Sequence, residues 1–221
     1  MSRDQKSTVI FDLDGTITRY DTYVRFLLYS LFRQPWKIFR LPGLTIDILK
    51  HKSGRQTNTW LKVRFLDALL AGQKKDRLDH WADDFASHVF SSGTYKDAIA
   101  HIKEHQKQNH ELVLLSASLD LYVMPLGKLL GFDHIICTKT AWQRGQLDNK
   151  LAGGNCYGEI KAQRINEWCA NHQENRITLA YGDHATDFPV LKSADRGIVV
   201  NPDRKLRLQA LDNNLEIICW K

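Results

Sequence analysis

The sequence has no long hydrophobic run and few cysteines. Its stretches without a charged residue, such as residues 112–119, are far shorter than the about 18 apolar residues that a membrane-spanning helix needs. Residues 1–6 lead into the first apolar segment without the hydrophobic core of a secretion signal. We therefore expect no spanning helix and predict a cytoplasmic protein.

The cysteines, at positions 137, 156, 169 and 219, include no Cys-x-x-Cys pair and have no histidines at zinc-finger spacing. This argues against a structural zinc site and favours reduced thiols. Internal repeats and low-complexity linkers are also lacking. The 221 residues are enough for one core of roughly 100 to 200 residues and a modest second domain.

Positive charge is concentrated in one segment. The whole chain has a net charge of +6, whereas residues 19–64 contain ten lysines or arginines and two aspartates, a net charge of +8. No recognised nucleic-acid-binding motif accompanies this charge, so we expect no nucleic-acid partner. Two interpretations stay open: a solvated basic face, or peripheral contact with the anionic inner face of a membrane.

The hydrophobic pattern indicates strands alternating with helices over most of the chain. Residues 9–11 suit a short buried strand. Further along, the pattern predicts helices at 97–108, 119–130 and 159–170 and strands at 111–115, 135–137, 177–181, 198–200 and 215–219. Because such alternation is typical of βαβ units, we predict an α/β fold with a mainly parallel sheet flanked by helices.

One long segment shows helical spacing and little strand signal. A largely buried helix is expected at 22–34, and a helical pair or a surface-contacting loop at 36–50. Apolar residues three and four apart return from residue 57 onward. We predict a core domain of residues 1–20 and 91–221, interrupted by a helical cap domain of residues 21–90.

Two aspartates follow the first predicted strand, in the segment VIFDLDGT at residues 9–16. Asp12 and Asp14 are expected at the carboxyl end of that strand, where open α/β sheets bind ligands. A tight hairpin turn at Asp14 and Gly15 is the alternative. A calcium loop fits poorly, since its glycine belongs at the sixth position and its glutamate at the twelfth, which here is Tyr23.

Two further places offer groups that bind anions. Ser116, Ala117 and Ser118 follow a predicted strand and present hydroxyls and backbone amides, which suit an anion cradle or a helix cap. Lys161 opens a later helix. Taken alone it is a surface lysine, whereas beside a phosphate and several carboxylates it supplies fixed positive charge.

A second pair of acids follows the strand predicted at 177–181. Asp183 and Asp187 are four residues apart, so a helical turn brings them to one face. If they face Asp12 and Asp14, the cluster repels itself without a cation. Because all four donors are oxygens, the expected ion is a hard one, and Mg²⁺ is the best candidate.

In chain order, these residues resemble the four motifs of the haloacid dehalogenase superfamily of phosphatases. The motifs are DLDGT at residues 12–16, Ser116 after an apolar strand, Lys161, and Gly182-Asp183 with Asp187. The resemblance spans nearly the whole chain. It implies a Rossmann-like core, and the helical insert is similar to the type-one cap of subfamily IB, which contains phosphoserine phosphatase.

The resemblance also implies how the two leading aspartates divide the chemistry. Asp12 is the implied nucleophile, which becomes an aspartyl phosphate, and Asp14 protonates the leaving alcohol and later deprotonates water. Ser116 and the backbone amide of Ala117 are implied to bind phosphoryl oxygens. Lys161 neutralises the nucleophile and the transferring group.

The implied metal ion is Mg²⁺. Its ligands are Asp12, the backbone carbonyl of Asp14, and Asp183. Asp187 holds a metal-bound water or lies just behind the ligands. The resemblance therefore gives all four aspartates a part in one metal site.

The substrate stays open, as does the oligomeric state. Asp21 replaces the glutamate that phosphoserine phosphatases carry nine residues after the nucleophile, and Thr186 replaces a typical asparagine. Asp21 is the candidate for binding the substrate. The basic, aromatic-rich segment 25–52, with segments 155–161 and 201–204, also resembles the branch that includes phosphatidylglycerophosphatase C. Four functions remain as alternatives. They are a phosphoserine phosphatase-like enzyme, a lipid phosphatase at the membrane surface, an enzyme that transfers the phosphoryl group to a second hydroxyl, and a non-catalytic module that binds a phosphorylated ligand.

Overall fold

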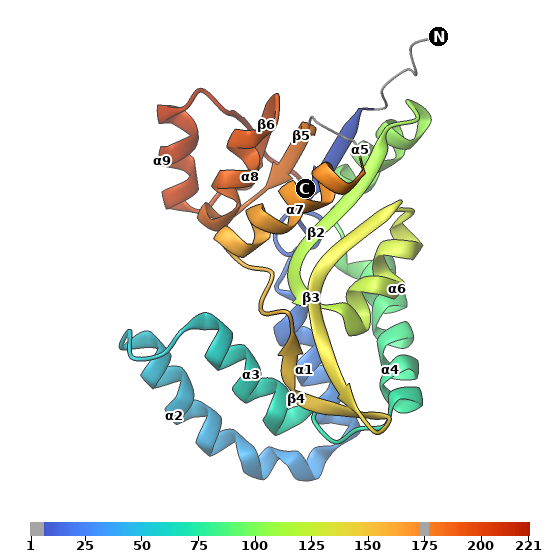
Figure 1. Cartoon of the computed structure of the whole chain (residues 1–221), viewed down its shortest axis with the longest axis vertical. Helices are drawn as coiled ribbons and strands as arrows, with labels where there is room; N and C mark the ends of the chain where they lie inside the picture. The colour runs from blue at the N-terminus through green and yellow to red at the C-terminus, as the bar shows by residue number, and fades with distance from the viewer. Residues whose placement is uncertain (1–6, 173–176) are drawn as a thin grey trace.

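The computed structural model describes residues 7–172 and 177–221, and the fold it shows is α/β (Figure 1). A seven-stranded sheet has the order β4-β3-β2-β1-β5-β6-β7. All neighbouring strands are parallel except β3 and β4, which form an antiparallel hairpin. The strands are β1 (Thr8–Phe11), β2 (Glu111–Leu119), β3 (His134–Gln143), β4 (Gln146–Ala152), β5 (Ile177–Gly182), β6 (Arg196–Val200) and β7 (Glu216–Ile218). The predicted mainly parallel α/β fold is confirmed.

The helices form two groups along the chain, those before β2 and those after it (Figure 1). The helices before β2 are α1 (Thr22–Arg33), η1 (Pro35–Arg40), α2 (Leu41–Lys52), α3 (Asn58–Leu69), α4 (Lys75–His88), the π-turn η2 (Val89–Gly93) and α5 (Lys96–Lys107). The later ones are α6 (Asp120–Leu130), α7 (Glu159–Asn171), η3 (Ala185–Asp187), α8 (Phe188–Ser193) and α9 (Arg204–Asp212).

Alternation along the central strands divides the apolar residues between two faces of the sheet. Phe11 and Leu114 belong to a cluster with α5, α6 and the cap helices, whereas Ile10, Val113 and Leu115 belong to a second cluster with α7, α8 and α9. Both faces of the sheet are therefore covered by helices, as parallel sheets require.

The structure decides two alternatives that the sequence left open and adds one strand. Asp14 and Gly15 do not join a hairpin, because β1 lies in the middle of the sheet and pairs in parallel with β2 and β5. Residues 146–152, where no strand was predicted, form β4 and pair with β3. The segment at 36–50, left open between helices and a loop, forms η1 and α2.

The predicted division into core and cap remains a prediction. In the structure α4 packs against α6, and β4 contacts α3, so the β3–β4 hairpin reaches the helices of the insert (Figure 1). Within residues 7–172 and 177–221, no helix combines the length and apolar character that crossing a bilayer demands. The four cysteines form no disulfide.

Candidate active site

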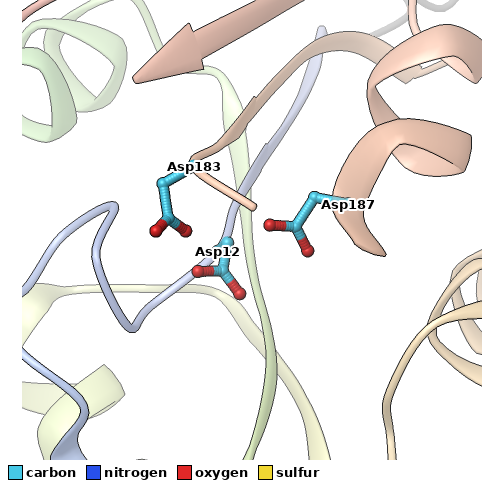
Figure 2. A group of neighbouring side chains, drawn as sticks. All are labelled: Asp12, Asp183 and Asp187. Carbon is cyan, nitrogen blue, oxygen red and sulfur yellow. The ribbon is translucent and has the colours of Figure 1, made fainter. Parts of the chain in front are cut away.

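Three aspartates from two segments meet at the carboxyl ends of β1 and β5. Asp12 directly follows β1, Asp183 directly follows β5, and Asp187 closes η3. Figure 2 shows the three carboxylates turned toward one another. One oxygen from each lies within 4.8 Å of the others, and Asp12 and Asp187 are buried. Adjacent parallel strands thus bring together acids that are far apart in the chain.

A glycine allows the two segments to approach this closely. Gly15 has φ +87°, and a β-carbon at this position would overlap the carboxylate of Asp183. The next residue, Thr16, donates a hydrogen bond from its hydroxyl to Asp183 at 3.2 Å. The turn after Asp12 therefore both makes room for Asp183 and orients it.

Lys161 supplies the positive charge of the cluster. It lies in the first turn of α7, is buried, and forms ion pairs with Asp12 and, at 2.6 Å, with Asp187. Burial alone would lower the pKa of Lys161, but the two carboxylates outweigh it and hold the pKa above its ordinary value. Lys161 is thus a permanent cation here and not a surface lysine.

One lysine does not balance three carboxylates. The pKa of Asp12 is raised to about 7, mainly by burial, with Lys161 opposing the rise and the charges of Asp187 and Asp14 adding to it. Burial also raises the pKa of Asp183 to about 8, together with the charges of Asp12 and Asp187. Converging oxygens with surplus negative charge suit a hard divalent cation. This donor set fits Mg²⁺, for which ligands on opposite sides lie about 4 Å apart.

Asp14 faces a different set of partners. Its carboxylate accepts hydrogen bonds from the amide and the hydroxyl of Thr22, both at 2.6 Å, and from the Ser118 hydroxyl at 2.5 Å. Burial and then the charge of Asp21 raise the pKa of Asp14, while the bonds from Ser118 and Thr22 oppose that rise. Its side chain therefore stands outside the three-aspartate cluster, in surroundings that favour a carried proton.

The segment of Ser116, Ala117 and Ser118 has a buried part and a part that faces the cavity. Ser116 is fully buried, and its hydroxyl accepts a hydrogen bond from the Ser118 amide at 3.0 Å. Ala117 and Ser118 line the cavity beside Asp12, whereas Ser116 does not. None of these residues caps α6, since Leu119 occupies the N-cap position without a side-chain bond.

Lys62 joins the cap helix α3 to the same segment. Its ammonium donates hydrogen bonds to the carbonyl of Ala117 at 2.6 Å and to Asn155 Oδ1 at 2.9 Å. Burial lowers the pKa of Lys62 to about 8, although Asp14 and Asp21 oppose the change. Lys62 and Thr22 were not predicted from the sequence, whereas Ser118 was predicted only as part of an anion cradle or helix cap. The position of Lys62 four residues after Asn58 was the available signal, because both lie on one helix face.

Asp21 lies at the start of α1. Its side chain accepts a hydrogen bond from the Val24 amide at 3.0 Å and so caps the helix. It is exposed and also lines the cavity. The geometry brings Asp21 to the edge of the site, with part of its hydrogen-bonding capacity already used by α1.

Most of these groups border one cavity of about 740 Å³, although Thr16, Thr22, Ser116 and Asn155 do not. Its polar end contains Asp12, Asp14, Lys161, Asp183 and Asp187. From there it extends between the helices of the insert. The volume lies within the range of roughly 300–1,000 Å³ that is usual for small-molecule sites.

The chain shares sequence with proteins of several bacteria. The haloacid dehalogenase-like hydrolase family matches residues 9–192. A protein of Mycobacterium tuberculosis named a probable phosphatase is 35% identical over 93% of this chain and 72% of its own length. The "inhibition of morphological differentiation protein" of Streptomyces azureus is 30% identical over 70% of this chain, and the match spans 56% of that relative.

Solved structures share the fold at low sequence identity. A Bordetella pertussis Tohama I protein of unknown function superposes with a TM-score of 0.83 at 23% identity, covering 96% of this chain and 98% of that one. A substrate-bound phosphoserine phosphatase superposes with a TM-score of 0.67 at 16% identity, covering 98% and 93%.

Proposed function

Because the chain belongs to the haloacid dehalogenase-like hydrolases, we propose that it hydrolyses phosphomonoesters with Mg²⁺ as cofactor, through an aspartyl phosphate at Asp12. The predicted family membership is confirmed. One observation carries the proposal: the Asp12 carboxylate meets a fixed cation and two further acids, while Asp14 is held separately by neutral donors. Two acids in such unequal surroundings suit unequal roles.

In the first half of the reaction, an oxygen of Asp12 attacks phosphorus and the bond to the ester oxygen breaks. Asp14 gives its proton to the departing alkoxide, so that an alcohol leaves. In the second half, Asp14 takes a proton from water while the water oxygen attacks phosphorus. The bond to Asp12 breaks, inorganic phosphate leaves, and both acids return to their starting states.

The other residues bind and neutralise. Asp12, Asp183 and the backbone carbonyl of Asp14 are the proposed ligands of Mg²⁺, and Asp187 would hold a metal-bound water or lie just behind the ligands. The ion, when bound, stabilises negative charge on the phosphoryl oxygens. Lys161 screens the nucleophile from the incoming phosphate and stabilises the charge that develops on it.

The phosphoryl oxygens also need hydrogen-bond donors. The backbone amide of Ala117, which lines the cavity, and the hydroxyl of Ser116 are the proposed donors. For a phosphoserine-like substrate, Asp21 is the proposed partner of the ammonium group. Its position at the cavity edge supports this role.

A second candidate is a lipid phosphatase that works at the membrane surface, similar to phosphatidylglycerophosphatase C. Exposed apolar side chains on η1 and α2 favour it, including Phe39 (86% exposed), Leu49 (62%) and Ile46 (56%). Lys50 and Lys52 lie among them in the basic segment. Apolar residues beside basic ones are typical of surfaces that contact anionic lipid.

Substitution of the two acids tests the mechanism. With p-nitrophenyl phosphate and Mg²⁺, Asp12→Asn is expected to abolish phosphate release, because no nucleophile remains. Asp14→Asn is expected to slow alkyl phosphates more than p-nitrophenyl phosphate, since nitrophenolate leaves without a proton. The wild-type rate is measured with Mg²⁺ and after chelation, and activity must depend on the ion.

Two results would contradict the mechanism. Full activity of Asp12→Asn with Mg²⁺ present would exclude Asp12 as the nucleophile. Tight binding of phosphate esters by the wild-type protein without any turnover would instead support the non-catalytic alternative. The presence of Asp14 argues against that alternative, because binding alone needs no second acid.

A further inference from the structure

The cavity that begins at Asp12 does not end at the polar site. It continues between α1 on one side and α2 and α3 on the other. We call the part bounded by these three helices the cap groove. Its character decides which alcohol portion of a phosphomonoester it accepts.

The α1 wall of the cap groove is apolar. Val24, Leu27, Leu28 and Leu31 line it, and they follow one another at helical spacings of three and four. Val24 and Leu28 are 50% and 46% exposed. Leaving such side chains against water is unfavourable, so an apolar occupant that covers them is stabilised.

The opposite wall has the same character. Leu41 and Ile48 of α2 and Leu61, Phe65 and Leu69 of α3 line it. No charged residue of α1 or α2 lines the cavity, and the charged lining residue of α3, Lys62, already binds the Ala117 carbonyl. Apart from Asp21, the N-cap residue of α1, a second charged group on the substrate, such as the ammonium and carboxylate of an amino acid, finds no charged partner along these walls.

We propose that the substrate is a phosphomonoester whose alcohol carries an apolar chain, with the phosphate at Asp12 and the chain in the cap groove. The inference rests on the proposed phosphatase function and specifies its substrate class. One cavity joins a site suited to a phosphate dianion to a groove whose walls are mainly hydrocarbon, with Tyr23 of α1 and Asn58 of α3 as uncharged polar residues in the lining. Such a ligand matches both ends at once.

Chain length is the direct test. Kinetics of n-alkyl phosphates from ethyl to octyl, kept below their micellar concentrations, should show kcat/KM rising by up to about fourfold per buried methylene. We expect at least a 100-fold difference between octyl and ethyl phosphate. Phosphoserine should resemble ethyl phosphate. A flat series in which ethyl phosphate is hydrolysed would overturn the inference and leave the phosphatase function standing.

Variants locate the chain. Leu28→Gln and Ile48→Gln, on facing walls, should each reduce the octyl-to-ethyl ratio by about tenfold or more. The matched control is Leu208→Gln, an exposed leucine of α9 (56%), which should keep the wild-type ratio. Because the readout is a ratio within one variant, partial loss of folded protein does not mimic the effect. An unchanged ratio in both groove variants would refute the location.

A binding measurement separates the proposed substrate preference of the cap groove from the proposed phosphatase activity. Calorimetry without added metal should show octyl phosphate binding to the wild-type protein at least 100-fold more tightly than ethyl phosphate, with the preference reduced in Leu28→Gln. Preferential binding without turnover of any ester would refute the phosphatase function and keep the groove. Equal binding of both esters would refute the groove.

Discussion

At the scale of single residues, the site depends on a glycine, which has no side chain. Gly15 combines a positive φ with close contact to Asp183. Gly54, in the turn after α2, has a similar φ of +74° but nothing within 4 Å of an added β-carbon. The two glycines therefore separate backbone strain from crowding of the metal site.

We expect Gly15→Ala to impair metal binding and Gly54→Ala to leave it intact. Both variants should lose about 1–2 kcal/mol of stability, because alanine disfavours the left-handed region. In Gly15→Ala the new methyl group also displaces Asp183, so the Mg²⁺ concentration for half-maximal activity should rise about tenfold or more. Titration of activity with Mg²⁺ checks this. Equal Mg²⁺ requirements in the two variants would contradict it.

Whether the place of a site residue could be predicted from the sequence depended on where in the chain its partners lie. Asp12 and Asp183 were expected to lie close together because each follows a strand, and strand ends converge in a parallel sheet. Asp187 was expected on the same face as Asp183 because it lies four residues later. The partners of Asp14 were not foreseen. Ser118 contacts it across 104 positions, and only the tertiary packing of β1 against β2 brings the two together.

At the scale of elements, His105 links α5 to β5. Its ring lies 2.9 Å from the Tyr181 hydroxyl and 2.9 Å from the His110 ring. Burial, followed by the neighbouring His110 and His101, lowers the pKa of His105 to about 4 from its ordinary 6.5. The folded protein therefore keeps this histidine neutral where the unfolded chain binds a proton.

The consequence is a loss of stability on acidification. Between pH 6.5 and 4 the unfolded chain takes up a proton that the native His105 refuses, so the free energy of unfolding falls as pH falls. Urea unfolding at pH 7 and pH 4.5 should show the wild-type protein losing about 1–2 kcal/mol more than His105→Gln. His88→Gln, at an exposed position, should behave as wild type. Equal losses in wild type and His105→Gln would rule out this role.

Elements with a strong period were predictable and those without one were not. Buried strands such as β1 and β5 are short apolar runs, and amphipathic helices such as α5 repeat every three to four residues. The β3–β4 hairpin escaped because β4 is mostly polar and its turn is Arg144-Gly145 rather than Asn-Gly. Both turn residues nevertheless have positive φ, as a tight hairpin turn requires.

At the scale of the whole molecule, charge and exposed apolar surface coincide. Residues 19–64 have a net charge of +8, whereas the whole chain has a net charge of +6, so the remaining residues together have a net charge of −2. The outward face of α2 bears Ile46 and Leu49, whereas Leu44 points inward and is buried. The helical arm formed by η1 and α2 is thus both basic and apolar on its outer side. From the sequence alone, this segment could face either solvent or lipid.

Vesicle sedimentation tests the membrane-surface candidate. The wild-type protein should sediment with anionic vesicles more than with neutral ones, and salt should weaken the binding. Phe39→Ser with Ile46→Ser should reduce binding more than tenfold, because two apolar contacts are lost. Leu208→Ser with Leu211→Ser, which removes two exposed leucines of α9, is the matched control and should bind as wild type. Equal loss in both double variants would refute a specific role for the arm.

The two walls of the cap groove are anchored at the reacting end of the cavity. The α1 wall begins at Thr22, whose amide and hydroxyl hold the carboxylate of Asp14, and the α3 wall is tied through Lys62 to the carbonyl of Ala117. A ligand that shifts either helix therefore also shifts Asp14 or the backbone at Ala117, the two groups proposed to act on the phosphoryl group. Contacts made far from phosphorus can in this way be expressed in the turnover number instead of in affinity alone.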